Sequence, residues 1–169
     1  MTALAGSKTE KNLQEAFAGE SQANRTYLAF AQKAEMDGHP QVAKLFRAAA
    51  EAETVHAHAH LRALKGISDT ASNLKEAVGG ETHEFMEMYP QMIADAEAEG
   101  LGDALRSFKY ANEVEKVHAN LYQKALDNLG SNGSVDYYVC KVCGNTIEGE
   151  PHGPCAVCAA GAQAFYKID

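Results

Sequence analysis

The feature that most constrains this 169-residue chain is a Glu-x-x-His motif that occurs twice, at Glu53 and His56 and again at Glu115 and His118. Residues three apart on a helix lie one above the other on the same face. One such pair is common by chance. A four-helix bundle that holds two metal ions, however, takes a Glu-x-x-His from each of two helices and one Glu from each of the other two. The sequence therefore predicts a four-helix bundle around a di-metal carboxylate site.

Hydrophobic periodicity and helix-end signals predict four long helices, at residues 7–37, 40–65, 81–99 and 101–129. Ser7 and Glu10 form a capping box for the first helix, and Pro40 suits the first turn of the second. Residues 67–80 are polar and rich in glycine, so they are predicted to be a crossover that returns along the bundle. Pro90 lies inside the third helix and should kink it or remove one hydrogen bond.

Carboxylates and imidazoles occupy inward positions on all four predicted helices. Burying a carboxylate without a partner is costly, so such a cluster requires cations. Carboxylate and imidazole ligands suit iron or manganese. The candidate ligands are Glu20, Glu53, His56, Glu81, Glu84, Glu115 and His118.

Three further side chains lie near the predicted ligands along the helices. Tyr27 follows Glu20 by two turns, and Tyr89 follows Glu84 by five residues. A buried tyrosine seeks a hydrogen-bond partner, so each could donate to a ligand carboxylate, and plain core packing is an equally good interpretation. His60 is interpreted as a core or supporting residue rather than a ligand.

All four cysteines lie close to the C-terminal end, as Cys140-x-x-Cys143 and Cys155-x-x-Cys158. Two such pairs predict a tetrathiolate metal site, and zinc and iron both fit the spacing. Strand-like residues 137–139 and 165–168 flank the pairs, and a segment this short needs a metal to hold it together. The polar linker 131–134 suggests two domains, residues 1–133 and 134–169.

Composition narrows the classes of partner. The net charge of -8 argues against binding to nucleic acid or to an anionic membrane surface. We find no apolar run long enough to span a membrane and no apolar core of a signal peptide near the N-terminus. The expected location is cytoplasmic.

The chain resembles the rubrerythrin family over essentially its whole length. The resemblance is carried by the two Glu-x-x-His motifs, by Gly-Glu-Ser-Gln-Ala at residues 19–23, by Gly-Glu-Thr-His-Glu at 80–84 and by Met-Tyr-Pro at 88–90. The cysteine-containing tail is similar to rubredoxin. The resemblance implies a mainly α fold, with a ferritin-like four-helix bundle followed by a small rubredoxin-like β domain stabilised by metal.

The resemblance also implies a function. It implies a non-haem di-iron site in which His56 is a further ligand that replaces Glu84 when the iron is reduced, with Tyr27 and Tyr89 close by. The implied activity is the reduction of hydrogen peroxide to water, a peroxidase that protects against oxidative stress. Electrons would pass through an iron bound by Cys140, Cys143, Cys155 and Cys158. A rubredoxin or an NAD(P)H-dependent reductase would supply them to a homodimer.

The chain departs from the family pattern at one position. Ala159 follows the last cysteine where the family has glycine, so we expect backbone strain in the turn around Cys155 and Cys158, the second cysteine knuckle.

Other functions are also compatible with the sequence. A ferritin-like ferroxidase with a structural zinc tail is the main alternative. A non-enzymatic module with a partner-binding zinc ribbon is another. A di-iron oxygenase is less favoured, because nothing in the sequence suggests a pocket for an organic substrate.

Overall fold

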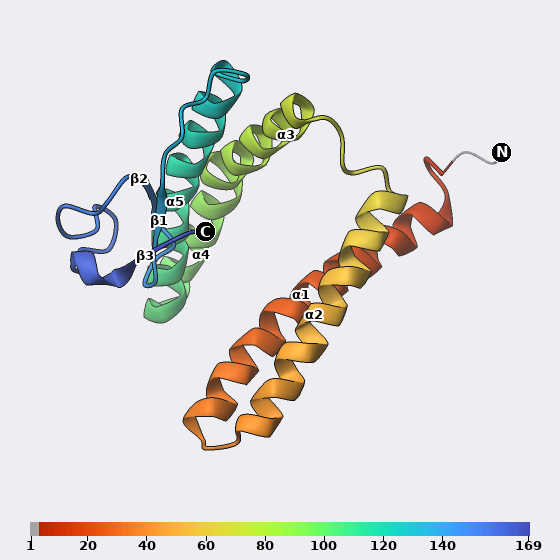
Figure 1. The fold of residues 1–169 in the computed structure, drawn as a ribbon, viewed down its shortest axis with the longest axis horizontal. Helices are drawn as coiled ribbons and strands as arrows, with labels where there is room; N and C mark the ends of the chain where they lie inside the picture. Colours follow the sequence, from red (N-terminus) through yellow and green to blue (C-terminus); the bar gives the residue numbers. More distant parts are fainter. Residues whose placement is uncertain (1–3) are drawn as a thin grey trace. The chain divides into compact units, whose positions relative to one another are not determined.

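The computed structural model describes residues 4–169 and divides into two compact units, Met1–Ser68 and Asp69–Asp169. The first unit is a pair of helices, and the second contains further helices and a small sheet (Figure 1). Among the described residues, no helix is both long enough and apolar enough to cross a membrane.

The first unit consists of α1 (Lys8–Met36) and α2 (Pro40–Ala63), which run side by side as a hairpin (Figure 1). Ser7 caps α1, because its Oγ accepts a hydrogen bond from the Glu10 N–H at 3.0 Å. The Glu10 carboxylate accepts in turn from the Gly6 N–H, one residue before the position that a standard capping box uses. Pro40 opens α2, where its missing N–H has no helical partner to lose.

Small residues let α1 and α2 approach each other closely. Ala31, Ala34 and Ala43 are buried together, and Ala50 and Ala57 are buried further along α2. The buried Asn24 sets the register, because its Nδ2 donates to the Ala50 carbonyl at 2.7 Å and to Thr54 Oγ1 at 2.9 Å. This register places Glu20 of α1 beside Glu53 and His56 of α2.

The second unit begins with α3 (Thr70–His83), which corrects the sequence interpretation. The sequence predicts a crossover at residues 67–80 around a short helix at 74–78, but the helix is longer than that, because α3 begins at Thr70 and continues to His83. Asp69 starts the helix, because its carboxylate accepts from the Ser72 N–H at 3.0 Å. Only residues 64–69 connect α2 to α3.

A π-helical segment, η1 (Glu84–Met88), joins α3 to α4 (Tyr89–Glu99). Pro90 has no N–H to donate to the carbonyl of Met86, so the regular pattern fails here. The Tyr89 N–H donates instead to the Glu84 carbonyl, five residues earlier. A π-helical turn adds one residue per turn, which brings a side chain five positions on back towards the same face. Tyr89 therefore returns to the side of Glu84.

The unit continues with α5 (Gly102–Asp127), which packs against α3 and α4. Gly100 ends α4 with φ of 68°, a left-handed conformation that glycine adopts without strain. Val114 and Ala119 are the buried residues of α5.

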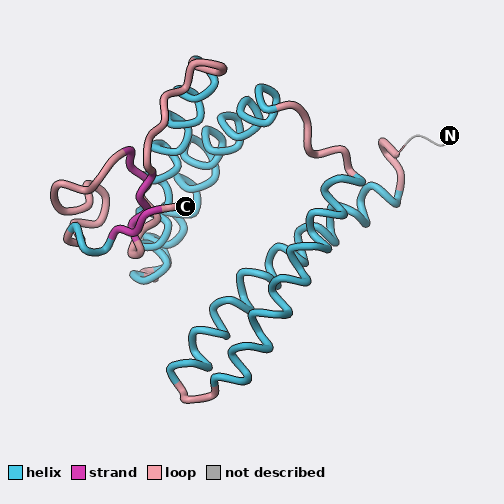
Figure 2. Tube along the Cα trace, in the orientation of Figure 1, coloured by secondary structure: helices cyan, strands magenta, loops and turns pink. Residues whose placement is uncertain are grey.

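The C-terminal part of the second unit is a three-stranded antiparallel sheet with the order β2-β1-β3 (Figure 2). Its strands are β1 (Tyr137–Cys140), β2 (Thr146–Glu148) and β3 (Phe165–Lys167). The sequence predicts β1 and β3, and it does not predict β2. A short 3-10 turn, η2 (Ala162–Ala164), precedes β3. The predicted fold class, mainly α with a small β domain that carries the cysteines, is confirmed.

Candidate metal centres

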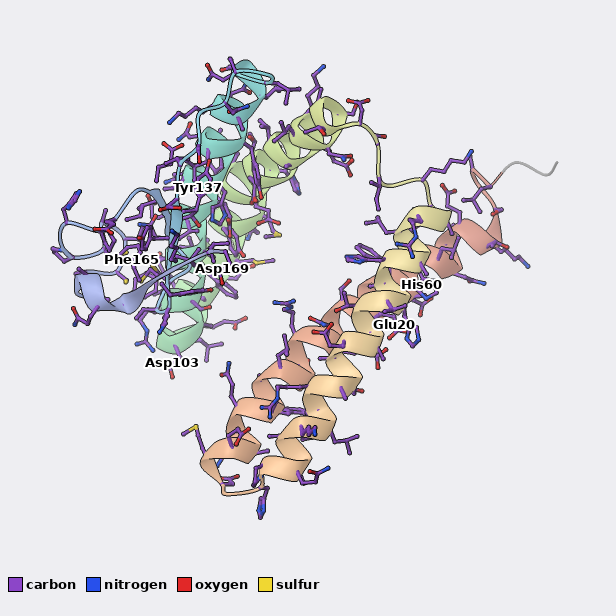
Figure 3. All side chains as sticks on the ribbon, in the orientation of Figure 1. Glu20, His60, Asp103, Tyr137, Phe165 and Asp169 are labelled. Atoms are coloured by element: carbon purple, nitrogen blue, oxygen red, sulfur yellow. The ribbon has the colours of Figure 1, made fainter. Side chains whose placement is uncertain are left out.

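The α1–α2 hairpin holds one group of potential metal ligands, formed by Glu20, Glu53 and His56. Their ligand atoms lie within 4.8 Å of one another. His56 Nδ1 is 2.9 Å from Glu53 Oε2 and 3.9 Å from Glu20 Oε1. Figure 3 labels Glu20 on α1 and His60 on the neighbouring α2; His60 is not among the three grouped ligands. We call this group the α1–α2 half-site.

The second unit holds a matching group, formed by Glu81 of α3 with Glu115 and His118 of α5. His118 Nδ1 is 2.7 Å from Glu115 Oε2 and 3.8 Å from Glu81 Oε1. These distances reproduce those of the first group within 0.2 Å. We call this group the α3–α5 half-site. Each half-site thus presents one imidazole and two carboxylates, one of which comes from a second helix of the same unit.

The donor set fits a divalent transition metal. Two carboxylates and an imidazole nitrogen supply the oxygen and nitrogen ligands that iron and manganese accept. The Glu115 side chain is 14% exposed and that of Glu53 is 18% exposed, so solvent relieves little of the charge on either carboxylate. A bound cation would offset that charge in both half-sites.

Two carboxyl groups in or near the α3–α5 half-site, those of Glu81 and Glu84, have raised pKa values. Burial and the nearby negative charge of Glu115 raise the pKa of Glu81 above its ordinary value. Burial and the charge of Glu81 likewise raise the pKa of Glu84, which the π-helical turn holds near this half-site. Crowded, partly buried carboxylates hold their protons more tightly, and a bound cation would favour their ionised forms.

The two tyrosines named from the sequence differ in their surroundings. Burial and the charges of Glu115 and Glu84 raise the pKa of Tyr89, so its hydroxyl stays protonated beside the carboxylates. Its ring also contacts Phe108, with centroids 6.3 Å apart. Tyr27 packs its ring against Phe46 of α2 at 6.1 Å and against Phe30 at 6.5 Å.

Thr146 is a polar contact of His118 that the sequence analysis did not identify. Its Oγ1 lies 3.0 Å from His118 Nε2 and 3.2 Å from the carbonyl oxygen of Gly144. The contact joins β2 of the small sheet to α5, and an ion pair between Lys124 and Glu148 joins the same two elements. No motif marks Thr146, because the contact depends on how the sheet packs on the helix.

The four cysteines converge at the end of the sheet as free thiols. Cys140 Sγ is 3.7 Å from Cys158 Sγ, and Cys143 Sγ is 3.5 Å from Cys155 Sγ. Sulfurs bound tetrahedrally at about 2.3 Å from a metal lie about 3.8 Å apart. The cluster therefore has the size of a tetrathiolate zinc or iron site.

Backbone amides stabilise a negative charge in this cluster. Burial opposes ionisation of Cys155, but the N–H groups of Cys158 and Val157 outweigh it and lower the pKa of Cys155 to about 7. Burial raises the pKa of Cys143. A thiolate at Cys155 near neutral pH provides one preformed ligand for an incoming cation.

The second cysteine knuckle contains the strained residue expected from the sequence. Ala159 has φ of 60°, and the equivalent position of the first knuckle is Gly144 with φ of 83°. The Ala159 N–H donates to the Cys155 carbonyl at 2.9 Å, as the Gly144 N–H donates to the Cys140 carbonyl at 2.8 Å. The turn is therefore preserved, although alanine is strained in this conformation.

Comparison with known proteins agrees with this geometry. The rubrerythrin family model matches residues 11–126. Rubrerythrin-2 of Clostridium acetobutylicum is 34% identical, over 92% of this chain and 94% of its own length. The rubrerythrin of Nitratidesulfovibrio vulgaris is also 34% identical, over 99% of this chain and 97% of its own.

Solved structures of nigerythrin are similar as well. The partially reduced and the fully reduced, all-ferrous states each match with a TM-score of 0.59 and 29% identity. Each match covers 99% of this chain and 94% of the nigerythrin chain. The family model, the relatives and the paired Glu-x-x-His half-sites lead to one conclusion: this chain belongs to the rubrerythrin family.

Proposed function

We propose that the chain is a non-haem di-iron peroxidase that reduces hydrogen peroxide to water. The reaction consumes two electrons and two protons for each peroxide and releases two water molecules. The family consists of oxidoreductases, and a di-iron, oxidative-stress-related role follows from membership of it. The peroxidase reaction is our proposal for this chain.

The observation that carries the proposal is the near-identity of the two half-sites. Each has its imidazole Nδ1 within 3 Å of one carboxylate and within 4 Å of another. A ferritin-like di-iron site uses two such groups, one for each metal ion. The α1–α2 half-site and the α3–α5 half-site would together supply that ligand set, with Glu84 as an additional carboxylate.

The proposed site divides the work among its residues. Glu20, Glu53, Glu81 and Glu115 would hold the two ions and offset their charge, and His118 would bind through Nδ1. Glu84 and His56 would be the ligands that replace each other between oxidation states. Tyr89 keeps its proton beside the carboxylates and could donate it in a hydrogen bond. When bound, the two irons would supply electrons and Lewis acidity to peroxide, and the tetrathiolate iron would relay electrons from a donor.

The remaining parts of the proposal concern domains and partners. Residues 1–133 would form the di-iron domain and residues 134–169 the rubredoxin-like domain. A rubredoxin or an NAD(P)H-dependent reductase would deliver the electrons, and the working form would be a homodimer. The Cys155 thiolate and the inter-sulfur distances near 3.6 Å support iron or zinc in the tail.

A stopped-flow experiment tests the function. Full-length protein, loaded with iron and analysed for metal, is reduced without oxygen and mixed with hydrogen peroxide or with air-saturated buffer. The visible absorption of the ferric tetrathiolate centre should return quickly with peroxide and slowly with air.

Other results would favour the rival function. A protein that stays colourless and contains zinc in its tail, yet oxidises added ferrous iron with oxygen, would be a ferroxidase with a structural tail. A His56→Ala variant with full iron and unchanged peroxide turnover would contradict the proposed ligand replacement but not the peroxidase activity.

A further inference from the structure

The hydroxyl of Thr146 has one proton, and its surroundings show where that proton goes. Gly144 offers a carbonyl oxygen, which can only accept a hydrogen bond, 3.2 Å from Thr146 Oγ1. The hydroxyl therefore donates to Gly144. Its oxygen is then free to accept, and the group that faces it at 3.0 Å is His118 Nε2. In a ring whose Nδ1 binds a metal, only Nε2 carries a proton, and Thr146 Oγ1 is placed to accept it.

This arrangement determines which ring nitrogen of His118 can bind a metal. A metal ion that binds Nδ1 takes the place of a proton on that nitrogen, and a hydrogen bond from Nε2 to Thr146 keeps the remaining ring proton away from the metal. Nδ1 is the nitrogen that faces Glu115 and Glu81, at 2.7 and 3.8 Å. The hydrogen bond to Thr146 thus aims the lone pair at the centre of the α3–α5 half-site.

We infer that Thr146 is a positioning residue for His118, and that it makes the tetrathiolate domain a structural part of the di-iron site. The inference rests on the proposed di-iron site. Gly144 directly follows Cys143, so the Thr146 hydroxyl connects the chain beside one thiolate ligand to the imidazole of the other metal centre. Histidines that bind metals are commonly held in this way by a partner on the second nitrogen.

A simpler role for Thr146 would be to fasten the sheet to the helix without affecting the metal. The chain offers a matched control for this role. Glu148, two residues further along β2, forms an ion pair with Lys124 of α5. It fastens the same strand to the same helix, but it is not among the ligand groups of the half-site.

Two measurements on the full-length protein test the inference, and neither uses peroxide. Both compare Thr146→Val, Thr146→Ser and Glu148→Gln with the parent chain. The first follows the Nε2–H signal of His118 by NMR in ¹⁵N-histidine-labelled, zinc-loaded protein. The second titrates Mn²⁺ into protein whose tetrathiolate site is filled with zinc, and follows free Mn²⁺ by electron paramagnetic resonance.

Valine should remove the slowly exchanging Nε2–H signal and weaken Mn²⁺ binding about tenfold, because the ring loses its acceptor. Serine should restore both properties, and Glu148→Gln should leave both as in the parent chain. The inference is overturned if valine changes neither property, or if Glu148→Gln has the same effect as valine. A chain that shows the expected pattern but does not reduce peroxide would refute the proposed peroxidase and leave the role of Thr146 intact.

Discussion

The two half-sites have the same ligands at nearly the same distances, but their histidines are held differently. Each histidine contacts the glutamate three residues before it through Nδ1, His56 at 2.9 Å and His118 at 2.7 Å. His118 also contacts Thr146 through its second nitrogen. Within the described residues of its own unit, one motif thus gives one imidazole held through Nδ1 and one held through both ring nitrogens.

This difference in contacts distinguishes a histidine that stays bound to its metal from one that can leave it, which the Glu-x-x-His motif alone cannot do. An anchored ring holds its metal in one geometry, because its rotation would break a hydrogen bond. A ring held through one nitrogen can move towards or away from a metal with less disruption of its neighbours. We expect His118 to be the permanent ligand and His56 the one that replaces Glu84. The first two predictions test this comparison.

The largest effect should come from the carboxylates, in which the two half-sites match. Glu53→Ala and Glu115→Ala should each weaken Mn²⁺ binding by about 100-fold or more, because each removes a carboxylate ligand and its negative charge from its half-site. Titration of the zinc-filled protein measures this. Glu51→Ala and Glu113→Ala, at exposed positions two residues earlier, are the matched controls. Near-parent affinity in either ligand variant would mean that its half-site binds no metal.

A smaller effect should separate the histidines. His118→Ala should weaken Mn²⁺ binding about tenfold more than His56→Ala does, because only His118 is anchored as a ligand. His58→Ala, an exposed histidine of α2, controls for the loss of an imidazole. Equal losses for His56 and His118 would show that the contact with Thr146 does not distinguish their roles.

The comparison extends to the two knuckles, where Gly144 and Ala159 occupy equivalent left-handed positions. Replacing Ala159 with Gly should relieve the strain and stabilise the zinc-loaded tail by about 1 kcal/mol. Chemical denaturation followed through zinc release measures the gain. The reverse change at the first knuckle, Gly144→Ala, should destabilise it by a similar amount. No gain from Ala159→Gly would mean that the knuckle accommodates alanine without strain.

The smallest effect should be a pH dependence in the metal-free α3–α5 half-site. The folded-state pKa of Glu81 is raised, so folding favours the protonated carboxyl. Its contribution to stability is complete below the unfolded pKa near 4.5 and disappears as the pH rises through the folded value. Denaturation of metal-free protein between pH 4 and about 7 should show this loss, and Glu81→Gln should reduce it. Bound metal should reverse the trend, since it requires the ionised form. An unchanged slope in Glu81→Gln would exclude Glu81 as its source.

Much of the chain could be predicted from local patterns. The Ser7 cap, the Pro40 start and the alternating small and apolar residues place α1 and α2 to within about two residues. The paired cysteines predict their own convergence, because four thiols within one short segment have few ways to bury without a shared metal. The positive φ of Ala159 could also be predicted, because this position of the turn usually holds glycine, which adopts positive φ without strain.

The sequence pattern underestimates helix where the composition is polar and rich in glycine. Residues 70–80 contain two glycines and several small polar residues, yet they form α3, because Asp69 caps the helix and α5 packs along it. The π-helical turn was not predicted either. The sequence indicated that Pro90 would remove a hydrogen bond, but whether a helix then kinks or inserts a residue depends on its neighbours.

The sequence by itself determined the ligand chemistry, because Glu-x-x-His and Cys-x-x-Cys place their donors through local geometry that any helix or knuckle supplies. Only the tertiary structure decided which imidazole is anchored. That depends on β2 lying against α5, so that Thr146 meets His118 across 28 positions of the chain. No periodicity encodes such a contact, since it arises from the packing of one element on another.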